Sequence, residues 1–201
     1  MADGVGESWR RIVTWYEGNT TPGTLVMPPG ASEEMVLVGE AEMGLRLPED
    51  LRAFYRLNDG LGGSFLLHYG EFLSLDRVVS HYASTPRPGD PGTEVEPFRL
   101  AGPIRPTWWS LLRVQITDNS GDGVMVDLDP LPGGTVGQVI KFDHEDGPVR
   151  VLAPSFAAWP VRIAAALEAG KLSWQPEDEW VAPPGYSTPG AYLKDWEAGW
   201  V

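Results

Sequence analysis

The residues best spaced for chemistry lie in one acidic segment, residues 118–129. Counted from its first residue, oxygen-bearing side chains stand at positions 1, 3 and 5, glycine at 6 and a carboxylate at 12, the ligand spacing of a calcium loop. The candidate ligands are Asp118, Ser120, Asp122 and Asp129. However, position 12 is Asp rather than the longer bidentate Glu, and the flanking residues are patterned as strands, not helices. We therefore predict a β-hairpin turn, which needs Asn, Gly and Asp for its backbone angles, with calcium binding as the alternative.

Two carboxylates in the same segment could act as a general acid–base pair. Asp127 and Asp129 stand two residues apart, so on a strand they point the same way and could share a proton. No distinct nucleophile or shaped pocket is indicated beside them. A solvated face of a sheet therefore explains the pair better.

Other catalytic patterns are missing from the sequence. The histidines at 68, 81 and 144 follow no ligand spacing, the chain has no cysteine, and no Gly-x-Ser-x-Gly elbow or phosphate-binding glycine loop occurs. A Ser/His/Asp triad assembles in space rather than in sequence, so an uncharacterised enzyme stays as an alternative. We expect no enzymatic activity, no cofactor and no metal.

The overall charge indicates which partners the chain attracts. Its 201 residues include 28 acidic and 15 basic side chains, a formal net charge of −13. Nucleic-acid phosphates and anionic membranes repel such a surface, whereas a basic protein is drawn to it. Acidity can equally serve solubility alone. Because no signal-like or membrane-spanning apolar run is present, we expect a cytoplasmic protein that binds neither nucleic acid nor membrane.

Helical periodicity and capping residues mark five segments. Ser32 is placed to cap the start of the second helix, which should end near Gly44. The predicted helices cover residues 7–17, 32–44, 48–57, 76–82 and 155–169. The side chains expected to point inward from the first, third and last are Trp9, Ile12, Val13 and Tyr16, then Leu51, Phe54, Tyr55 and Leu57, and finally Phe156, Trp159, Ile163 and Leu167.

Strand signals dominate the second half of the chain. Gly- and Asp-rich turns separate four short apolar runs at 112–117, 124–128, 136–142 and 149–152, a spacing typical of an antiparallel meander. A further short strand is expected at 65–67, and a proline-rich connection at 86–97. The pattern thus predicts helices together with an antiparallel meander.

The surfaces expected to contact a partner are acidic or aromatic. Charged side chains give the second helix an acidic side, and two more carboxylates lie at a strand edge. A tryptophan pair could anchor an interface, although at least one ring should pack under the sheet. The candidate contact residues are Glu33, Glu34, Glu40, Glu42, Trp108, Trp109, Asp127 and Asp129.

Several motifs together resemble a known family. They are Leu47-Pro48-Glu49-Asp50-Leu51, Asn58-Asp59-Gly60, Trp108-Trp109, Asp118-Asn119-Ser120-Gly121-Asp122-Gly123, Asp127-Leu128-Asp129-Pro130, the segment 133–140, and Val151-Leu152-Ala153-Pro154-Ser155-Phe156 followed by Trp159. On these motifs the chain resembles the SUKH superfamily, in the branch named after the fungal cell-wall assembly regulator (the SMI/KNR type). The resemblance covers roughly residues 7–174. It implies an α+β fold with a single, strongly curved antiparallel sheet (a meander) packed by helices.

The same resemblance implies a role without catalysis. Bacterial relatives look like immunity proteins that neutralise polymorphic or contact-dependent toxins, and fungal relatives look like regulatory scaffolds. We expect a domain over residues 1–174 and a Trp-rich acidic extension over 175–201, which either packs on the domain or forms a partner-binding arm. The expected function is stoichiometric binding of a toxin domain with a basic surface. The alternatives are a regulatory or scaffold protein and, after it, a calcium-dependent binder or an enzyme.

Overall fold

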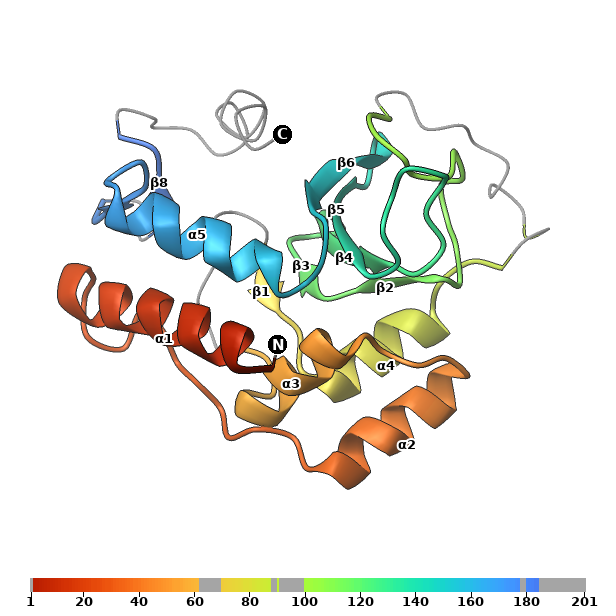
Figure 1. Ribbon diagram of the computed structural model, residues 1–201, viewed down its shortest axis with the longest axis horizontal. Coiled ribbons are helices and arrows are strands. Elements are labelled where there is room, and N and C mark those ends of the chain that lie inside the picture. The colour runs from red at the N-terminus through yellow and green to blue at the C-terminus, as the bar shows by residue number, and fades with distance from the viewer. Residues whose placement is uncertain (1, 62–69, 88–89, 91–99, 178–179, 185–201) are drawn as a thin grey trace.

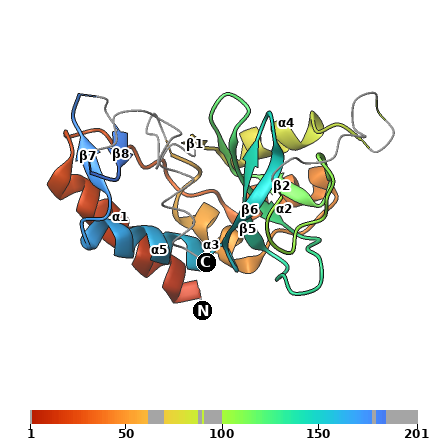
Figure 2. The same cartoon turned by 90° about the horizontal axis from the view of Figure 1, so that it is seen from above.

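The computed structural model describes residues 2–61, 70–87, 90, 100–177 and 180–184. A curved sheet occupies one half of the molecule, and helices lie beneath it and beside it (Figure 1). Seen from above, α1 and α5 run along the other half, away from the main sheet (Figure 2). The helices are α1 Ala2–Asn19, α2 Glu33–Met43, α3 Glu49–Leu57, α4 Leu75–Ala83 and α5 Ala158–Glu168. The α+β class is confirmed.

Capping residues form both ends of helix α2 where the sequence predicts them. Ser32 Oγ accepts a hydrogen bond from the Met35 amide, which satisfies one of the unpaired amides at the start of α2. Gly44 ends the same helix in the left-handed region with φ 68°, where a side chain would be strained. One inward position is wrong: Leu57, in the last turn of α3, has an exposed side chain.

Four antiparallel strands form the main sheet in the order β2-β4-β5-β6, which confirms the meander. They are β2 Arg113–Gln115, β4 Gly123–Asp127, β5 Gln138–Asp143 and β6 Gly147–Ala153. The β5–β6 register shifts twice, at 139/140 and at 141/142. Such irregularities increase the local bend and twist of a sheet, which here is open and strongly curved.

Two short ladders complete the described strands. β1 Glu71–Phe72 pairs with β3 Thr117–Asp118, and β7 Ser173–Gln175 pairs with β8 Trp180–Ala182. The extension expected from residue 175 thus starts inside β7, and Trp180 of β8 is buried in the main core. The strand expected at 65–67, most of the connection at 86–97 and residues 185–201 of the extension lie outside the described residues.

The core has two parts, one on each face of the main sheet. The larger part joins the five helices to one face and is centred on aromatic rings, with Phe54 and Phe72 4.4 Å apart and Trp159 fully buried beside them. The smaller part lies on the opposite face. It consists of Ile104, Met125, Ile140 and Phe142, with Trp108 and Trp109 packed against them.

Candidate protein-binding surface

Helix α2 buries only one narrow side. Val36, Gly39, Glu40 and Met43 face the protein at helical spacing. Gly39 allows close packing against α4, because a Cβ there would lie 3.3 Å from side-chain atoms of Leu75 and Val79. The remaining positions of the helix face solvent.

An ionic cluster fixes α2 against α3. Glu33 receives hydrogen bonds from Arg52 and Arg56, and Glu49 pairs with Arg56 at 2.7 Å. The hydrogen bond from Arg56 holds the pKa of the Glu33 carboxyl below its usual range. Glu40 is buried, where it accepts from the Leu47 amide at 2.8 Å. Glu40 is thus buried within the domain, which corrects its expected place on the acidic side, whereas Glu33 pairs with α3 and stays exposed.

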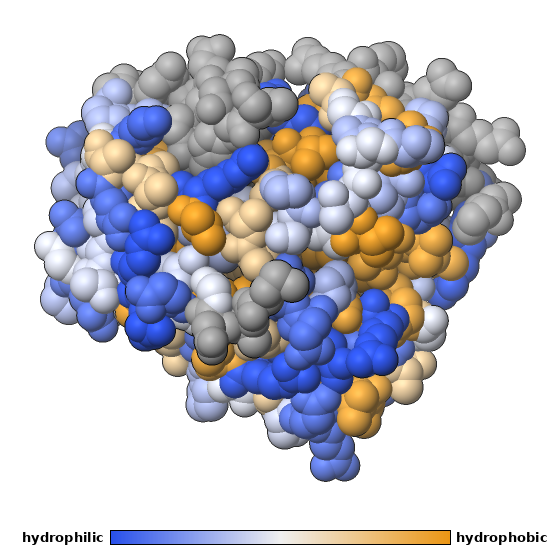
Figure 3. Space-filling view, in the orientation of Figure 1, coloured by the Kyte–Doolittle hydropathy of each residue, from blue (hydrophilic) through white to orange (hydrophobic). Residues whose placement is uncertain are grey.

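The outward side of α2 is largely apolar. Met35, Leu37 and Val38 have 47%, 52% and 51% of their surface exposed. Glu34 and Glu42 are exposed on the same side of the helix. We call this set, completed by Ala41, the α2 surface. Where α2 lies in Figure 1, Figure 3 shows apolar patches beside strongly hydrophilic ones.

The apolar part of this surface was missed from sequence. Its signal was a helix with apolar residues on every side, a composition typical of a buried helix. Here only one side of that helix is covered by the described part of the chain. An apolar side of a helix left in solvent is therefore a candidate interaction site.

The tryptophan pair belongs mainly to the smaller core. Trp108 and Trp109 are half-buried, and the ring of Trp109 lies 5.0 Å from that of Phe142. The expectation that at least one ring packs under the sheet is confirmed.

The expectation of a solvated face around Asp127 is wrong. Asp127 is fully buried, in register with Arg113 on β2 and Gln138 on β5. Its carboxylate accepts a hydrogen bond from the side-chain amide of Gln138 at 2.9 Å and lies 3.9 Å from the Arg113 guanidinium. Asp129, the second carboxylate, forms a surface ion pair with Arg105.

The segment that precedes β2 covers the face of the main sheet on which Asp127 lies. The Arg113 guanidinium donates hydrogen bonds at 2.6 Å to the carbonyl oxygens of Thr107 and Arg105. These bonds hold the segment before β2 over the buried Asp127. Burial lowers the pKa of Arg113, and Asp127 acts against that shift. A fully buried carboxylate offers no contact to a partner, so Asp127 leaves the set of candidates.

The acidic loop forms the predicted hairpin turn. Asn119 pairs with Asp122, and Ser120 and Gly121 between them have φ 56° and 100°, as a tight hairpin requires. The carboxylate of Asp118 accepts from the Gly121 amide at 3.1 Å. The loop therefore uses its polar side chains for its own geometry.

The four proposed calcium ligands do not converge. Asp122 binds His144 at 2.7 Å, whereas Asp129 pairs with Arg105. Over the described ranges, the group whose ligand atoms lie within 4.8 Å of one another is Asp122, Asp143 and His144, which shares only Asp122 with the predicted set. Asp122 also raises the pKa of His144, chiefly through their hydrogen bond.

Helices packed on an open, strongly curved antiparallel meander define a SUKH-type α+β domain. The model of the SMI1 / KNR4 family (SUKH-1) matches residues 30–160, and the chain belongs to this family. The match includes α2 and the whole main sheet. No helix in the described parts of the chain is both long and apolar enough to cross a bilayer.

Two curated relatives are similar over most of this chain. The "Cell wall assembly regulator SMI1" of Saccharomyces cerevisiae is 25% identical over 215 residues, which is 84% of this chain and 42% of the relative. The "Cell wall biosynthesis/cell cycle regulator smi1" of Schizosaccharomyces pombe is 30% identical over 189 residues, 83% of this chain and 37% of the relative. The chain thus spans about two fifths of these relatives' length.

Proposed function

We propose that this protein acts by stoichiometric binding of another protein, without catalysis, through the α2 surface. The observation that carries the proposal is the outward apolar side of a helix whose inner side is fixed by ion pairs. Apolar contact supplies the affinity of such interfaces, and a preformed helix loses little entropy on binding.

The chemistry of the surface indicates a basic partner. Glu34 and Glu42 border the apolar side chains, and the chain as a whole carries a net charge of −13. Opposite charges accelerate encounter, and a cationic rim on the partner would complement these carboxylates. A toxin domain with a basic face fits this description, and the protein would then be an immunity protein acting in the cytoplasm. The second candidate is a regulator or scaffold of cell-wall assembly, which the names of both relatives favour.

The test compares two exposed valines on different helices. Val38 on the α2 surface is 51% exposed and Val161 on α5 is 43% exposed, so lysine is tolerated at both without loss of the fold. The full chain and both variants are used to capture partners from native cells, and each captured protein is purified for calorimetry. We expect a one-to-one complex that Val38→Lys weakens by at least about tenfold, the effect of losing an anchor residue, and that Val161→Lys leaves unchanged.

Further measurements separate the candidate functions. Association should slow steeply as salt rises, while dissociation changes little. A partner that stops growth when expressed alone, and is harmless together with this chain, supports immunity; a partner harmless by itself supports the regulator. Equal binding by wild type and Val38→Lys would exclude the α2 surface, and turnover of a substrate by the purified chain would overturn the proposal.

A further inference from the structure

Two hairpin turns, at residues 119–122 and 144–146, lie side by side at one end of the main sheet. The β4–β5 register, continued by one residue, places Asp122 opposite Asp143. Gly121 packs against His144, where a Cβ on the glycine would lie 3.2 Å from the histidine Cβ. The Asp122 carboxylate also accepts a hydrogen bond from the His144 amide at 2.8 Å. The two turns are therefore in direct contact.

Three side chains that can bind a metal ion meet where these turns touch. One ligand atom from each of Asp122, Asp143 and His144 lies within 4.8 Å of the other two. Asp122 Oδ1 and His144 Nδ1 are 2.7 Å apart. In a tetrahedral zinc site, with bonds of about 2.0–2.1 Å, the ligand atoms lie roughly 3.3 Å apart. Side-chain rotations that open the first distance by about 0.6 Å and close the others by at most about 1.5 Å therefore suffice to enclose an ion.

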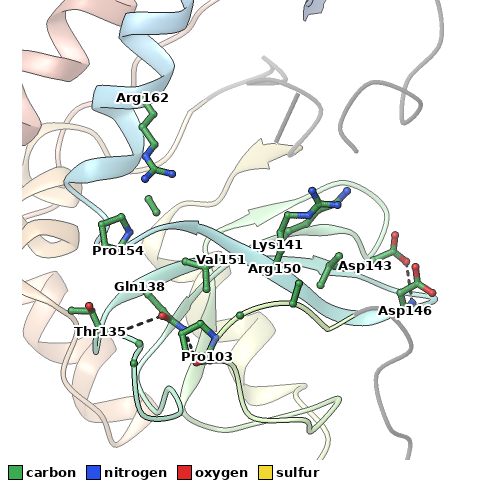
Figure 4. A pocket seen from close by; sticks show the side chains of 16 residues that line it. Pro103, Thr135, Gln138, Lys141, Asp143, Asp146, Arg150, Val151, Pro154 and Arg162 are labelled. Atoms are coloured by element: carbon green, nitrogen blue, oxygen red, sulfur yellow. Dashed lines mark hydrogen bonds between the residues drawn. The ribbon is translucent and has the colours of Figure 1, made fainter. Parts of the chain in front are cut away.

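The carboxylate of Asp143 is held in place by its own turn. Its Oδ1 accepts hydrogen bonds from the amides of Glu145 and Asp146 at 2.8 and 3.1 Å, and the second of these bonds is drawn in Figure 4. Among the described residues Oδ2 accepts no hydrogen bond, so this oxygen is available as a ligand. A ligand that is fixed in advance loses little conformational entropy when it binds.

The charge of the ligand set favours a divalent cation. Two carboxylates opposite each other on neighbouring strands repel, and a cation bound between them removes that repulsion. The other charged side chains of the β5–β6 hairpin balance one another in number: Lys141 and Arg150 against Glu145 and Asp146. The two ligand carboxylates therefore give the site its net negative charge, which a divalent ion neutralises.

The mixture of donor atoms favours zinc over calcium and magnesium. Ca²⁺ and Mg²⁺ prefer oxygen ligands throughout, whereas Zn²⁺ binds imidazole nitrogen together with carboxylate oxygen. Three protein ligands leave one position of a tetrahedral zinc ion to water. Asp143 also lines a cavity of about 700 Å³ (Figure 4), which gives room for that water molecule.

We propose that Asp122, Asp143 and His144 bind one zinc ion, with water as the fourth ligand. The ion takes the place of the hydrogen bond between the Asp122 carboxylate and the His144 ring, and it joins the two hairpin turns. The site shares no residue with the α2 surface, so zinc binding is a property separate from the proposed protein binding.

Calorimetric titration of Zn²⁺ into the full chain, freed of any histidine tag, tests the proposal. We expect one saturable site per chain, and no saturable heat with Ca²⁺ or Mg²⁺. Asp143→Asn, which keeps an oxygen for the two turn amides, and His144→Gln should each weaken zinc binding at least about tenfold, because even partners outside the ligand set matter by about 10–100-fold. His81→Gln is the matched control, since this histidine lies on α4 outside the ligand set, and it should leave zinc binding unchanged.

NMR of the histidine rings locates the ion in the wild-type chain, without any substitution that could damage the fold. Zn²⁺ should shift the ring signals of His144 and leave those of His81 in place. The proposal is overturned if zinc gives no saturable binding, if calcium binds as tightly as zinc, or if Asp143→Asn and His144→Gln bind zinc like the wild type. A zinc isotherm without a change in the His144 signals would place the ion elsewhere and overturn it as well.

Discussion

Removing the buried charge of Asp127 provides the sharpest test of the sheet's interior. Asp127→Asn keeps the shape of the side chain and an acceptor for the Asp129 amide, now 3.1 Å away. What disappears is the negative charge beside Arg113, whose side chain is also buried. Because asparagine has a single side-chain oxygen, the hydrogen bond that Asp127 accepts from the side-chain amide of Gln138 at 2.9 Å is lost as well, so the substitution tests the charge together with that bond.

The expected cost follows from the geometry of the pair. For unit charges 3.9 Å apart at an effective dielectric constant of about 20, the attraction is about 4 kcal/mol. Breaking a buried ion pair by removing one partner typically costs about 3–5 kcal/mol. Arg113 keeps its hydrogen bonds to the carbonyls of Thr107 and Arg105, so we expect the lower end, about 3 kcal/mol of unfolding free energy.

Urea unfolding followed by tryptophan fluorescence measures this loss, since the chain has nine tryptophans. Asp129→Asn is the matched control, because its carboxylate pairs with Arg105 on the surface and should matter much less. In the double variant Arg113→Met/Asp127→Asn, the two costs should be less than additive by roughly 2 kcal/mol. A loss below about 1 kcal/mol for Asp127→Asn would refute the reasoning, because a pair so weakly coupled is not buried.

Two further predictions concern the main core and the hairpin. Trp159→Ala should lower the unfolding free energy by about 3–5 kcal/mol, because it empties a fully buried site beside Phe72 and Phe156; a nearly neutral result in urea unfolding would contradict that burial. The His144 ring should titrate above its ordinary pKa by NMR, and Asp122→Asn should lower that midpoint. Because the pKa of His144 is higher in the folded protein than in the unfolded one, its interaction with Asp122 stabilises the fold fully below the unfolded pKa, and this stabilisation is lost as the pH rises through the folded pKa. A titration midpoint that Asp122→Asn leaves unchanged would exclude the contact with Asp122 as the cause of the raised pKa.

Helices and strands could be predicted because their signals are local. Ser32 and Gly44 mark the ends of α2 through backbone groups within a few residues of them. Gly- and Asp-rich turns separate the four strands in the same way, since tight turns demand residues that accept positive φ. Neither signal depends on which distant segment packs against the element.

The burial of an individual side chain could be predicted from the sequence only where residues close to it in the chain determine it. Alternation placed Asp127 on one face of β4, but the segment that covers that face precedes β2 and has no regular period of its own. Similarly, Glu40 is buried because Leu47, seven residues further on, supplies its amide after the chain turns back. The exposure of Met35 and Val38 depends on which side of α2 meets α4, which its composition does not reveal.

The contact between α1 and α5 has a consequence for the order of folding during synthesis. Arg11 on α1 binds Glu168 on α5 across 157 positions of the chain. A ribosome adds roughly 5–20 residues per second, so about 8 to 30 s pass between the two residues. During that interval α3 can already cover Trp9 through Phe54, but the side of α1 that packs on α5 has no partner. The nascent chain thus presents an amphipathic helix to the solvent for many times longer than a helix needs to form.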